Sequence, residues 1–421
     1  MPNFSIPLSG LDASSAALST AANNLANLNT IGYKDQQIQF ADLFYQNLGS
    51  DGAGDPIQQG AGVKVSSQPS DFTQGDVTST GIDTDVAING NGFFVVQQNG
   101  VASYTRAGNF EVGTNNLLET ADGQQVLGYP ATNGVVNTSA GLGTLALGAG
   151  EVSPAAVTAN VSLTSNLDAT GGVGSAYSTQ VQIYDSLGAS HNLTFTYTNT
   201  ATNTWTYNVT IPAADVGATG APVSVGSGTL TFNGDGTLAT PTTNPVLAVP
   251  PVAVSPATQL VFADGANQLS FTWNMMNAAG TGLLTQLAGP SSTVSIQQDG
   301  TSSGTLQNFA IGSDGTITGS FSNGTTAVLG QIALASFADE QGLSRNGDND
   351  FSPTLASGQP TVGAPTSGGL GSISGGALEQ SNVDIATEFA NLIVAQRTYE
   401  ANARVVTTFD QVAQDTIALK Q

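Results

Sequence analysis

Residues 21–34 read AANNLANLNTIGYK and follow a stretch in which apolar side chains alternate at spacings of three and four. The stripe continues upstream over about 20 residues and contains Leu8, Leu11, Ser15, Leu18, Ala22 and Leu25. Such heptad-like spacing predicts an amphipathic helix with one apolar face. The asparagines after it lead to Gly32, which can end the helix because glycine readily adopts a left-handed backbone.

A second apolar stripe lies at the other end of the chain. After the glycine-rich stretch 368–376, Ser381 or Asn382 can cap a helix. Its apolar positions include Ile385, Phe389, Leu392, Ile393, Tyr399, Val406, Phe409, Ala413 and Ile417. An unbroken helix of about 35–40 residues is typical of coiled coils and assemblies. We expect the two stripes to pack against each other, against neighbouring copies, or both; two separate helices on a β core are the alternative.

The region between the stripes has a period of two. Residues 181–183, 193–197 and 205–211 alternate apolar and polar side chains between turn-forming stretches, which predicts an antiparallel meander. Hairpin signals of the Asn-Gly or Asp-Gly type follow at 233–236, 299–300, 314–315 and 323–324. The proline-rich run 241–256 predicts a sheet edge or a loop. The expected fold class is therefore mainly β with terminal α-helices.

The composition excludes several classes of function. The 421 residues contain 30 Asp or Glu but only 7 Lys or Arg, giving a net charge of −23, which argues against nucleic acid and anionic membranes as partners. The absence of cysteine excludes disulfides and thiolate sites. No base lies between Arg106 and Arg345, yet 39% hydrophobic residues in regular alternation predict folding rather than disorder. Residues 1–10 do not resemble a secretory signal, so the chain is either cytoplasmic or exported by a dedicated route.

Three patterns that resemble chemical sites have simpler explanations. Residues 300–304 match G-x-S-x-G, but the flanks predict antiparallel strands and the single histidine, His191, lies upstream, so a β-turn is favoured. Asp348, Asn349 and Asp350 lack the spacing of a calcium loop and predict a solvated loop. The chain offers no second His or Cys that could bind a metal with His191, so we expect His191 to be a surface or packing residue. We expect no catalytic, cofactor or metal site.

The two ends of the chain resemble the terminal signatures of bacterial flagellar rod and hook axial proteins. Near the N-terminus an asparagine-rich helix end precedes a Gly-aromatic-Lys turn, through Asn23, Asn24, Asn27, Gly32, Tyr33 and Lys34. Residues 381–385 (SNVDI) and 394–403 (VAQRTYEANA) resemble the partner signature, which includes Gln396, Arg397 and Tyr399. Residues 74–110 resemble the β domain that these proteins share, and residues 161–168 with the meander resemble the extra outer domain of hook proteins, which distal rod proteins lack.

The resemblance covers nearly the whole chain and implies a domain order. Residues 1–32 and 378–421 would form a terminal helical coiled coil, 33–70 a connecting segment, 71–152 and 287–377 an inner β domain, and 153–286 an outer β domain. The positions expected to form the assembly helices are Leu11, Leu18, Leu25, Ile385, Phe389, Leu392, Tyr399, Val406 and Phe409.

The resemblance further implies a non-enzymatic hook subunit that polymerises with itself into a flexible curved tube and transmits motor torque. It implies the distal rod protein, the hook cap, hook-filament junction proteins and the flagellar type III export apparatus as partners, and an extracellular hook location reached without a cleavable signal. Another axial protein, such as a distal rod protein, is one alternative. A secreted β-rich adhesin or glycan-binding protein is the alternative from a different class.

The absence of Lys and Arg between Arg106 and Arg345 suggests a further hypothesis. Uncharged hydroxyl and amide surfaces can slide past each other through many similar water-mediated contacts, as a bending tube requires. An acidic surface that simply keeps an exported protein soluble is the competing explanation.

Overall fold

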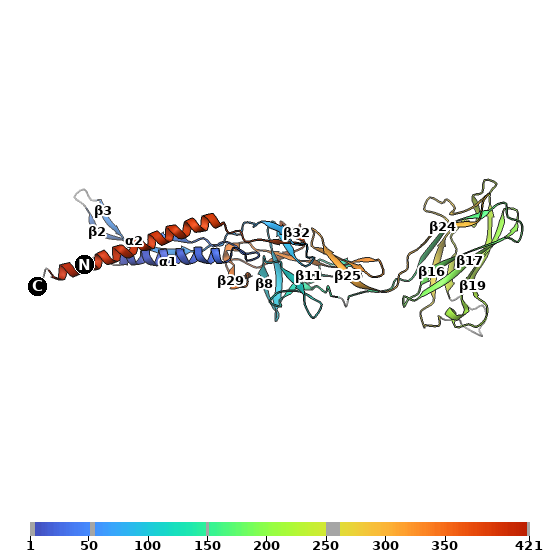
Figure 1. Cartoon of the computed structure of the whole chain (residues 1–421), viewed down its shortest axis with the longest axis horizontal. Helices are drawn as coiled ribbons and strands as arrows, with labels where there is room; N and C mark the ends of the chain where they lie inside the picture. The colour runs from blue at the N-terminus through green and yellow to red at the C-terminus, as the bar shows by residue number, and fades with distance from the viewer. Residues whose placement is uncertain (1–4, 51–54, 149–150, 250–261, 419–421) are drawn as a thin grey trace. The chain divides into compact units, whose positions relative to one another are not determined.

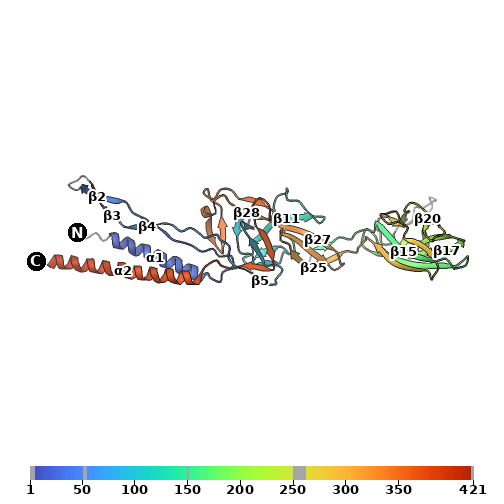
Figure 2. The same ribbon diagram turned by 90° about the horizontal axis from the view of Figure 1, so that it is seen from above.

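Helices lie toward both ends of the chain, and β-strands fill the stretch between them. The computed structural model describes residues 5–50, 55–148, 151–249 and 262–418. Helix α1 spans Ser5–Ala26 and helix α2 spans Ile385–Ala418, and the two lie side by side in both views (Figures 1 and 2). The predicted class, mainly β with paired terminal helices, is confirmed. Within the described residues no helix is both long and apolar enough to span a membrane.

The ends of both helices differ from the predicted positions. Helix α1 ends at Ala26, and further turns carry the chain to Gly32, where the left-handed φ of 68° redirects it. Helix α2 is capped by Asp384, whose side chain accepts a hydrogen bond from the Thr387 amide at 2.7 Å. Neither Ser381 nor Asn382 is the cap, because the Asn382 amide is engaged by the segment that follows α1.

The described residues form two compact units. The inner unit contains residues up to 150 together with 308–319 and 326–421, and the outer unit contains 151–307 and 320–325. The predicted outer boundary at residue 286 lies too early, because strand β24 (Ser292–Gln298) pairs antiparallel with β15 (Asn160–Asp168). Residues 287–307 therefore belong to the outer unit.

The connecting segment 33–70 contains two strand pairs. Strand β1 (Gln39–Asp42) pairs with β4 (Val63–Ser67), and β2 (Tyr45–Ser50) pairs with β3 (Pro56–Gly60), both antiparallel. Strand β4 also contacts α1, so this segment returns alongside the helices (Figure 2).

The β part of the inner unit centres on strand β7 (Phe93–Gln98), which is buried on both faces. Alternate side chains enter different clusters: Phe94 and Val96 pack with Leu118 and Ile332, whereas Phe93 and Val95 pack with Tyr104 and Phe351. The other strands of this unit are β5 (Val77–Ser79), β6 (Val86–Asn89), β8 (Val101–Thr105), β9 (Phe110–Val112), β10 (Leu118–Thr120), β11 (Gln125–Thr132), β12 (Val135–Val136), β13 (Gly143–Thr144), β27 (Thr326–Ile332), β28 (Leu334–Ser336), β29 (Ser344–Gly347), β30 (Asp350–Ser352), β31 (Thr361–Gly363), β32 (Ser372–Gly375) and β33 (Ala377–Glu379). A 3₁₀ turn, η2, spans Glu340–Gly342. Strands β25 (Gly304–Ile311) and β26 (Thr316–Phe321) contain residues of both units.

The outer unit is built from two facing sheets. One is the antiparallel meander β16-β17-β18-β19-β20, which confirms the prediction for this stretch. Its strands are β16 (Ala176–Tyr184), β17 (Ser190–Ala201), β18 (Thr204–Ile211), β19 (Val223–Phe232) and β20 (Leu238–Thr240), with the 3₁₀ turn η1 at Ala213–Val216. The other sheet joins β21 (Val246–Val249), β22 (Leu269–Asn274), β15 and β23 (Leu284–Leu287), with β24 paired to β15. Strand β14 (Val152–Ser153) precedes it.

Aromatic side chains fill the space between these two sheets. Trp273 of β22 meets Phe195 of β17 and Tyr207 of β18 edge-to-face, with ring centroids 4.9 and 5.0 Å apart. Strand β21 lies at the sheet edge, as the proline-rich run predicts, while residues 250–256 of that run lie outside the described residues.

Candidate assembly site

Small side chains line the contact between α1 and α2. The buried residues of α1 include Ala13, Ser14, Ala21 and Asn24, and those of α2 are Glu388 and Ala395. A Cβ at Gly10 would lie 2.9 Å from the Asn402 amide nitrogen, so only glycine allows this approach without a shift. The most buried residues of the two helices are therefore mainly small or polar.

The predicted assembly positions are less buried than these residues. Leu11, Leu18, Leu25, Leu392, Val406 and Phe409 are half-buried, whereas Ile385, Phe389 and Tyr399 are exposed. Further large apolar side chains of α2 are also exposed, namely Ile393, Val394, Val405, Val412 and Ile417. A single chain thus leaves much of the apolar surface of α2 in contact with solvent.

A groove runs between α1, α2 and the start of the connecting segment. It has a volume of about 650 Å³, and its lining includes Ala17 of α1 and Val394 of α2. Two carboxyl groups also line it. Glu388 is 5% exposed and accepts a hydrogen bond from the Asn391 amide, but its Oε2 has no partner among the described residues; the same holds for the buried Oδ1 of Asp35. Burial, and then repulsion by Glu388, raises the pKa of Asp35 to about 6.

The turn after α1 depends on Gly32. A Cβ at this position would lie 2.6 Å from the Ala107 nitrogen and the Arg106 carbonyl carbon, and the positive φ would strain any other residue. The Gly32 amide donates to the Glu379 carbonyl at 2.9 Å. The turn is thereby fixed to the last strand before α2.

A buried ion cluster holds the two ends of the inner unit together. The Lys34 Nζ lies 2.6 Å from Glu379 Oε1 and also donates to the Thr73 carbonyl at 2.7 Å. Arg106 Nη1 lies 3.4 Å from the other carboxylate oxygen, and its Nη2 donates to the Gly90 carbonyl. The Lys34 and Glu379 side chains are fully buried. Burial lowers the pKa of both Lys34 and Arg106, and the nearby Glu379 carboxylate opposes this shift.

The asparagines of the signature bind the end of α1 to the following turn. Asn24 is fully buried; its Oδ1 accepts from the Tyr33 hydroxyl and the Gln36 amide, both at 3.1 Å, and its Nδ2 donates to the Gln36 carbonyl. The Asn23 amide donates to the Tyr33 hydroxyl at 3.1 Å, and the Asn27 amide donates to the Asn23 carbonyl at 2.9 Å. The Asn23 and Asn24 side chains therefore attach the end of α1 to residues 33–36.

Two residues that sequence reasoning did not assign to the site, Glu379 and Arg345, complete it together with Asn382 of the C-terminal signature. Glu379 is the common partner of Lys34 and Arg106, while the Arg345 Nη2 donates to the Lys34 carbonyl at 2.6 Å and its guanidinium covers the Tyr33 ring. Asn382 accepts from the Asp35 amide at 2.7 Å. The small number of Lys and Arg residues was the signal that could have predicted these partners. A buried base needs a carboxylate, and so few bases allow only a few pairs.

The remaining signature residues lie on the solvent side of α2. Gln396 is exposed, and the Arg397 side chain is 79% exposed with only a loose pair to Glu400 at 3.7 Å. Tyr399 is also exposed.

The patterns set aside as chemical sites have structural roles. Residues 299–303 connect β24 to β25, with Thr301 in an isolated β-bridge to Ala156, and Gly304 begins β25. Asp348 and Asn349 form the turn between β29 and β30 with positive φ values of 49° and 59°. Asp350 is buried beside Gln124, which corrects the expectation of a solvated loop at that position.

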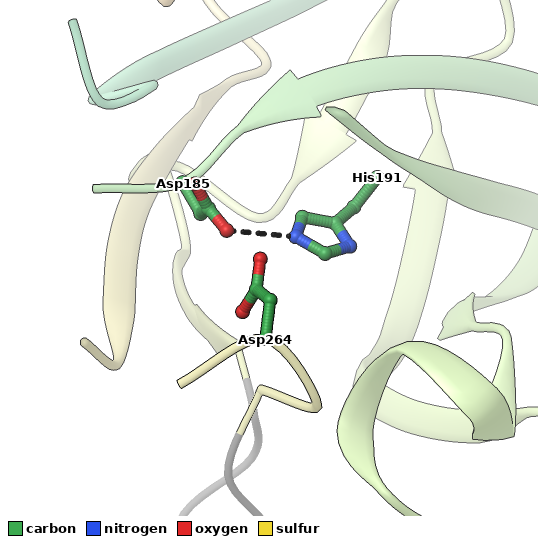
Figure 3. Close-up of side chains that lie close together, drawn as sticks. All are labelled: Asp185, His191 and Asp264. Atoms are coloured by element: carbon green, nitrogen blue, oxygen red, sulfur yellow. Dashed lines mark hydrogen bonds and ion pairs between the residues drawn. The ribbon is translucent and has the colours of Figure 1, made fainter. Parts of the chain in front are cut away.

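His191 is buried within a group of carboxylates in the outer unit. Its Nε2 lies 3.1 Å from Asp185 Oδ2 (Figure 3). Its Nδ1 lies 3.2 Å from Asp215 Oδ2, and its ring stacks on Phe262. Asp264 also points toward this pair. Burial alone would raise the pKa of Asp185, but hydrogen bonds, that from His191 foremost, outweigh it and lower the pKa. Both ring nitrogens therefore have protein partners, in keeping with a packing role.

Comparison with known proteins gives matches along the whole chain. Four domain families match: Flagella basal body rod protein at residues 6–34, Flagellar hook protein FlgE/F/G D1 domain at 87–173, Flagellar basal body protein FlaE D2 domain at 153–301, and Flagellar basal body rod FlgEFG protein C-terminal at 374–419.

Full-length relatives share about a third of their residues with this chain. The flagellar hook protein FlgE of Salmonella typhimurium is 36% identical over 99% of this chain and 100% of its own length. Those of Escherichia coli and Borreliella burgdorferi are each 34% identical, covering 99% and 98% of this chain and 100% and 98% of their own lengths. Among solved structures, the Helicobacter pylori flagellar hook protein FlgE2 aligns with a TM-score of 0.48 at 14% identity, over 72% of this chain and 100% of that one.

Proposed function

Because the chain belongs to the flagellar hook protein family FlgE, we propose that it polymerises through its terminal helices into a flexible tube that transmits torque from the motor to the filament. The family is structural, so the chain is a structural subunit of the bacterial flagellar hook and not an enzyme. Its own copies are its main partner, in an open head-to-tail array.

The exposed apolar surface of α2 is the observation that supports assembly through the helices. Ile393 and Val394 are 55% and 65% exposed although they lie in the middle of a long, well-formed helix. Large exposed apolar patches on a soluble protein mark interaction sites. Neighbouring subunits in a tube would cover these side chains, which the single chain leaves in water.

The other protein partners that we propose follow from the position of a hook within the flagellum. We propose that the polymer starts on the distal rod protein, grows under the hook cap and ends at the hook-filament junction proteins. We further propose that the chain reaches its extracellular position through the flagellar type III export apparatus without a cleavable signal. The absence of cysteine supports passage as an extended chain, since no disulfide can lock a folded form.

Electron microscopy of the concentrated, purified chain tests assembly. The wild-type protein should form tubes of uniform width, and the double variant Ile385→Ser, Phe389→Ser should not, because it removes apolar contact area from α2. Both residues are about half exposed, so folding of the monomer should be unaffected. The matched control is Val173→Ser, Leu187→Ser, which removes exposed apolar residues from the outer unit and should leave the tubes intact. Loss of tubes in the control alone would contradict assembly through the helices.

A further inference from the structure

The two arginines of helix α2 lie on the face opposite Glu388, where Arg397 also forms a loose pair with Glu400 at 3.7 Å. Glu388, Ala395 and Asn402 recur every seven residues and all line the groove against α1. Arg397 and Arg404 follow Glu388 by nine and sixteen positions, which at about 100° per residue places them roughly 180° and 160° away around the helix. We call the exposed surface around these two residues the arginine face.

The groove contains negative charge that the chain itself leaves without a full set of partners. Glu388 Oε2 and Asp35 Oδ1 are both buried and accept no hydrogen bond from the described residues. The positive charge of Arg345 lowers the pKa of Asp35, but the hydrogen bonds of Arg345 go to Ser70 and the Lys34 carbonyl. The buried carboxyl group of Glu388 and the half-buried one of Asp35, on a wall of small residues, therefore form what we call the acidic groove.

Few cations are available to enter this groove. Among the described residues, Lys34, Arg106 and Arg345 are committed to contacts within the inner unit, which leaves Lys64, Arg397 and Arg404 as exposed bases. Lys64 lies on a β-strand of the connecting segment, whereas the two arginines lie on a long helix with exposed apolar neighbours such as Ile393. A helix face with both charge and apolar area suits a groove with carboxylates and an alanine-rich wall.

We propose that the acidic groove receives the arginine face of α2 from a second copy of this chain, with a guanidinium bound to Glu388 and Asp35. The proposal rests on self-assembly, the proposed function above, and specifies which surfaces meet. A planar guanidinium is suited to this role because its several donors can serve both carboxylates together.

The position of the two surfaces determines the kind of assembly. Since the groove and the arginine face lie on opposite sides of one helix, a copy bound through its arginine face still offers a free groove. Such a contact joins two different surfaces and does not close on a pair, so it propagates into an open array.

The strength of this contact is measured by the critical concentration at which the full chain polymerises. The variant Arg397→Gln, Arg404→Gln should raise it about tenfold or more, because each buried carboxylate would lose its counter-charge. Lys64→Gln is the matched control, which removes one exposed base outside α2 and should change the value less than about twofold. Equal effects of the arginine and lysine variants would overturn the proposal while leaving self-assembly intact. Failure of the wild-type chain to polymerise would instead overturn the proposed function itself.

A double-mutant cycle tests whether the arginines act on these carboxylates. In the background Glu388→Gln, Asp35→Asn, adding the arginine substitutions should change the critical concentration less than about twofold. A further rise of about tenfold would show that the arginines bind elsewhere and would overturn the assignment. Circular dichroism of each monomer verifies that the helices are intact.

Cysteine cross-linking gives a readout that does not depend on charge, because the chain has no cysteine of its own. Copies with Asn391→Cys, on the groove wall, should form disulfide-linked dimers with copies carrying Ala401→Cys, between the arginines, when the mixed polymer is oxidised. Efficient cross-linking in polymers of Ala401→Cys alone would mean that like faces meet, which contradicts the proposal.

Discussion

The outer unit and the terminal helices differ in how completely one chain buries their apolar side chains. In the outer unit, Trp205 and Trp273 are 1% and 0% exposed between two sheets. In α2, Phe389 and Ile393 are 48% and 55% exposed along a helix of 34 residues. The outer unit therefore completes its core within one chain, whereas α2 leaves large apolar side chains exposed.

The two regions also differ in the handling of charge. The outer unit contains no Lys or Arg, and its carboxylates are served by backbone amides, hydroxyls and the single histidine. The inner unit places Lys34 and Arg106 on one buried carboxylate. The bases are thus used where the two ends of the chain must be joined.

The largest expected effect tests the self-sufficiency of the outer unit. Trp273→Ala should destabilise this unit by about 4 kcal/mol, because it removes a fully buried ring and leaves a cavity. Urea unfolding followed by tryptophan fluorescence from Trp205 should move to lower urea, while the helical circular dichroism signal stays in place. The control Leu287→Ala truncates a side chain that is 50% exposed and should shift the curve little. Parallel loss of the helix signal would contradict the separation of the two regions.

The buried ion cluster should respond nearly as strongly. Glu379→Gln leaves Lys34 and Arg106 buried without a counter-charge, which costs about 3 kcal/mol. Urea unfolding of the inner unit measures the loss. Glu111→Gln neutralises an exposed carboxylate of the same unit and should be nearly silent. If both variants unfold at the wild-type urea concentration, the cluster does not hold the ends of the unit together.

A substitution at Gly32 tests the geometry of the turn without changing its charges. Gly32→Ala adds a Cβ 2.6 Å from backbone atoms at a φ of +68°, and we expect a loss of about 2 kcal/mol. Gly123→Ala, also at positive φ but with open space around it, is the matched control and should cost about 1 kcal/mol. Equal losses in thermal unfolding would mean that backbone strain alone, and not the close approach to Arg106 and Ala107, explains the glycine.

Sequence periodicity predicted the helices and the meander because both patterns depend on local spacing. Val181, Phe195 and Val209 alternate with polar residues, and the structure buries all three. The extent of the outer unit was harder, since residues 292–298 carry no signal that they pair with β15 more than 120 residues earlier. Such long-range pairing follows from tertiary packing and not from local pattern.

The site was predictable in part for the same reason. The signature identified Gly32 and Lys34 but not their common partner Glu379, because Glu379 lies 345 residues away from Lys34 in sequence. The apolar stripes identified the helices correctly but not their most buried positions. Periodicity detects large apolar residues, whereas the buried residues of the two helices include Ala13, Ser14, Ala21 and Ala395.

The smallest expected effect concerns Asp35, in the region that awaits a partner. Its folded-state pKa of about 6 exceeds the ordinary value of 3.8, so the folded chain holds the proton more tightly than the unfolded chain. The contribution of Asp35 to stability is therefore fully present below about pH 4 and is lost as the pH rises through 6. Asp35→Asn should remove this dependence of stability on pH and make the monomer more stable than wild type at pH 7. The measurement is the urea midpoint of the helical circular dichroism signal at pH 4 and at pH 7. Asp12→Asn, on the exposed side of α1, should keep the wild-type slope. An unchanged slope in Asp35→Asn would mean that this carboxyl is not strained in the free chain, and a slope that persists undiminished in the wild-type polymer would mean that no neighbouring cation relieves it.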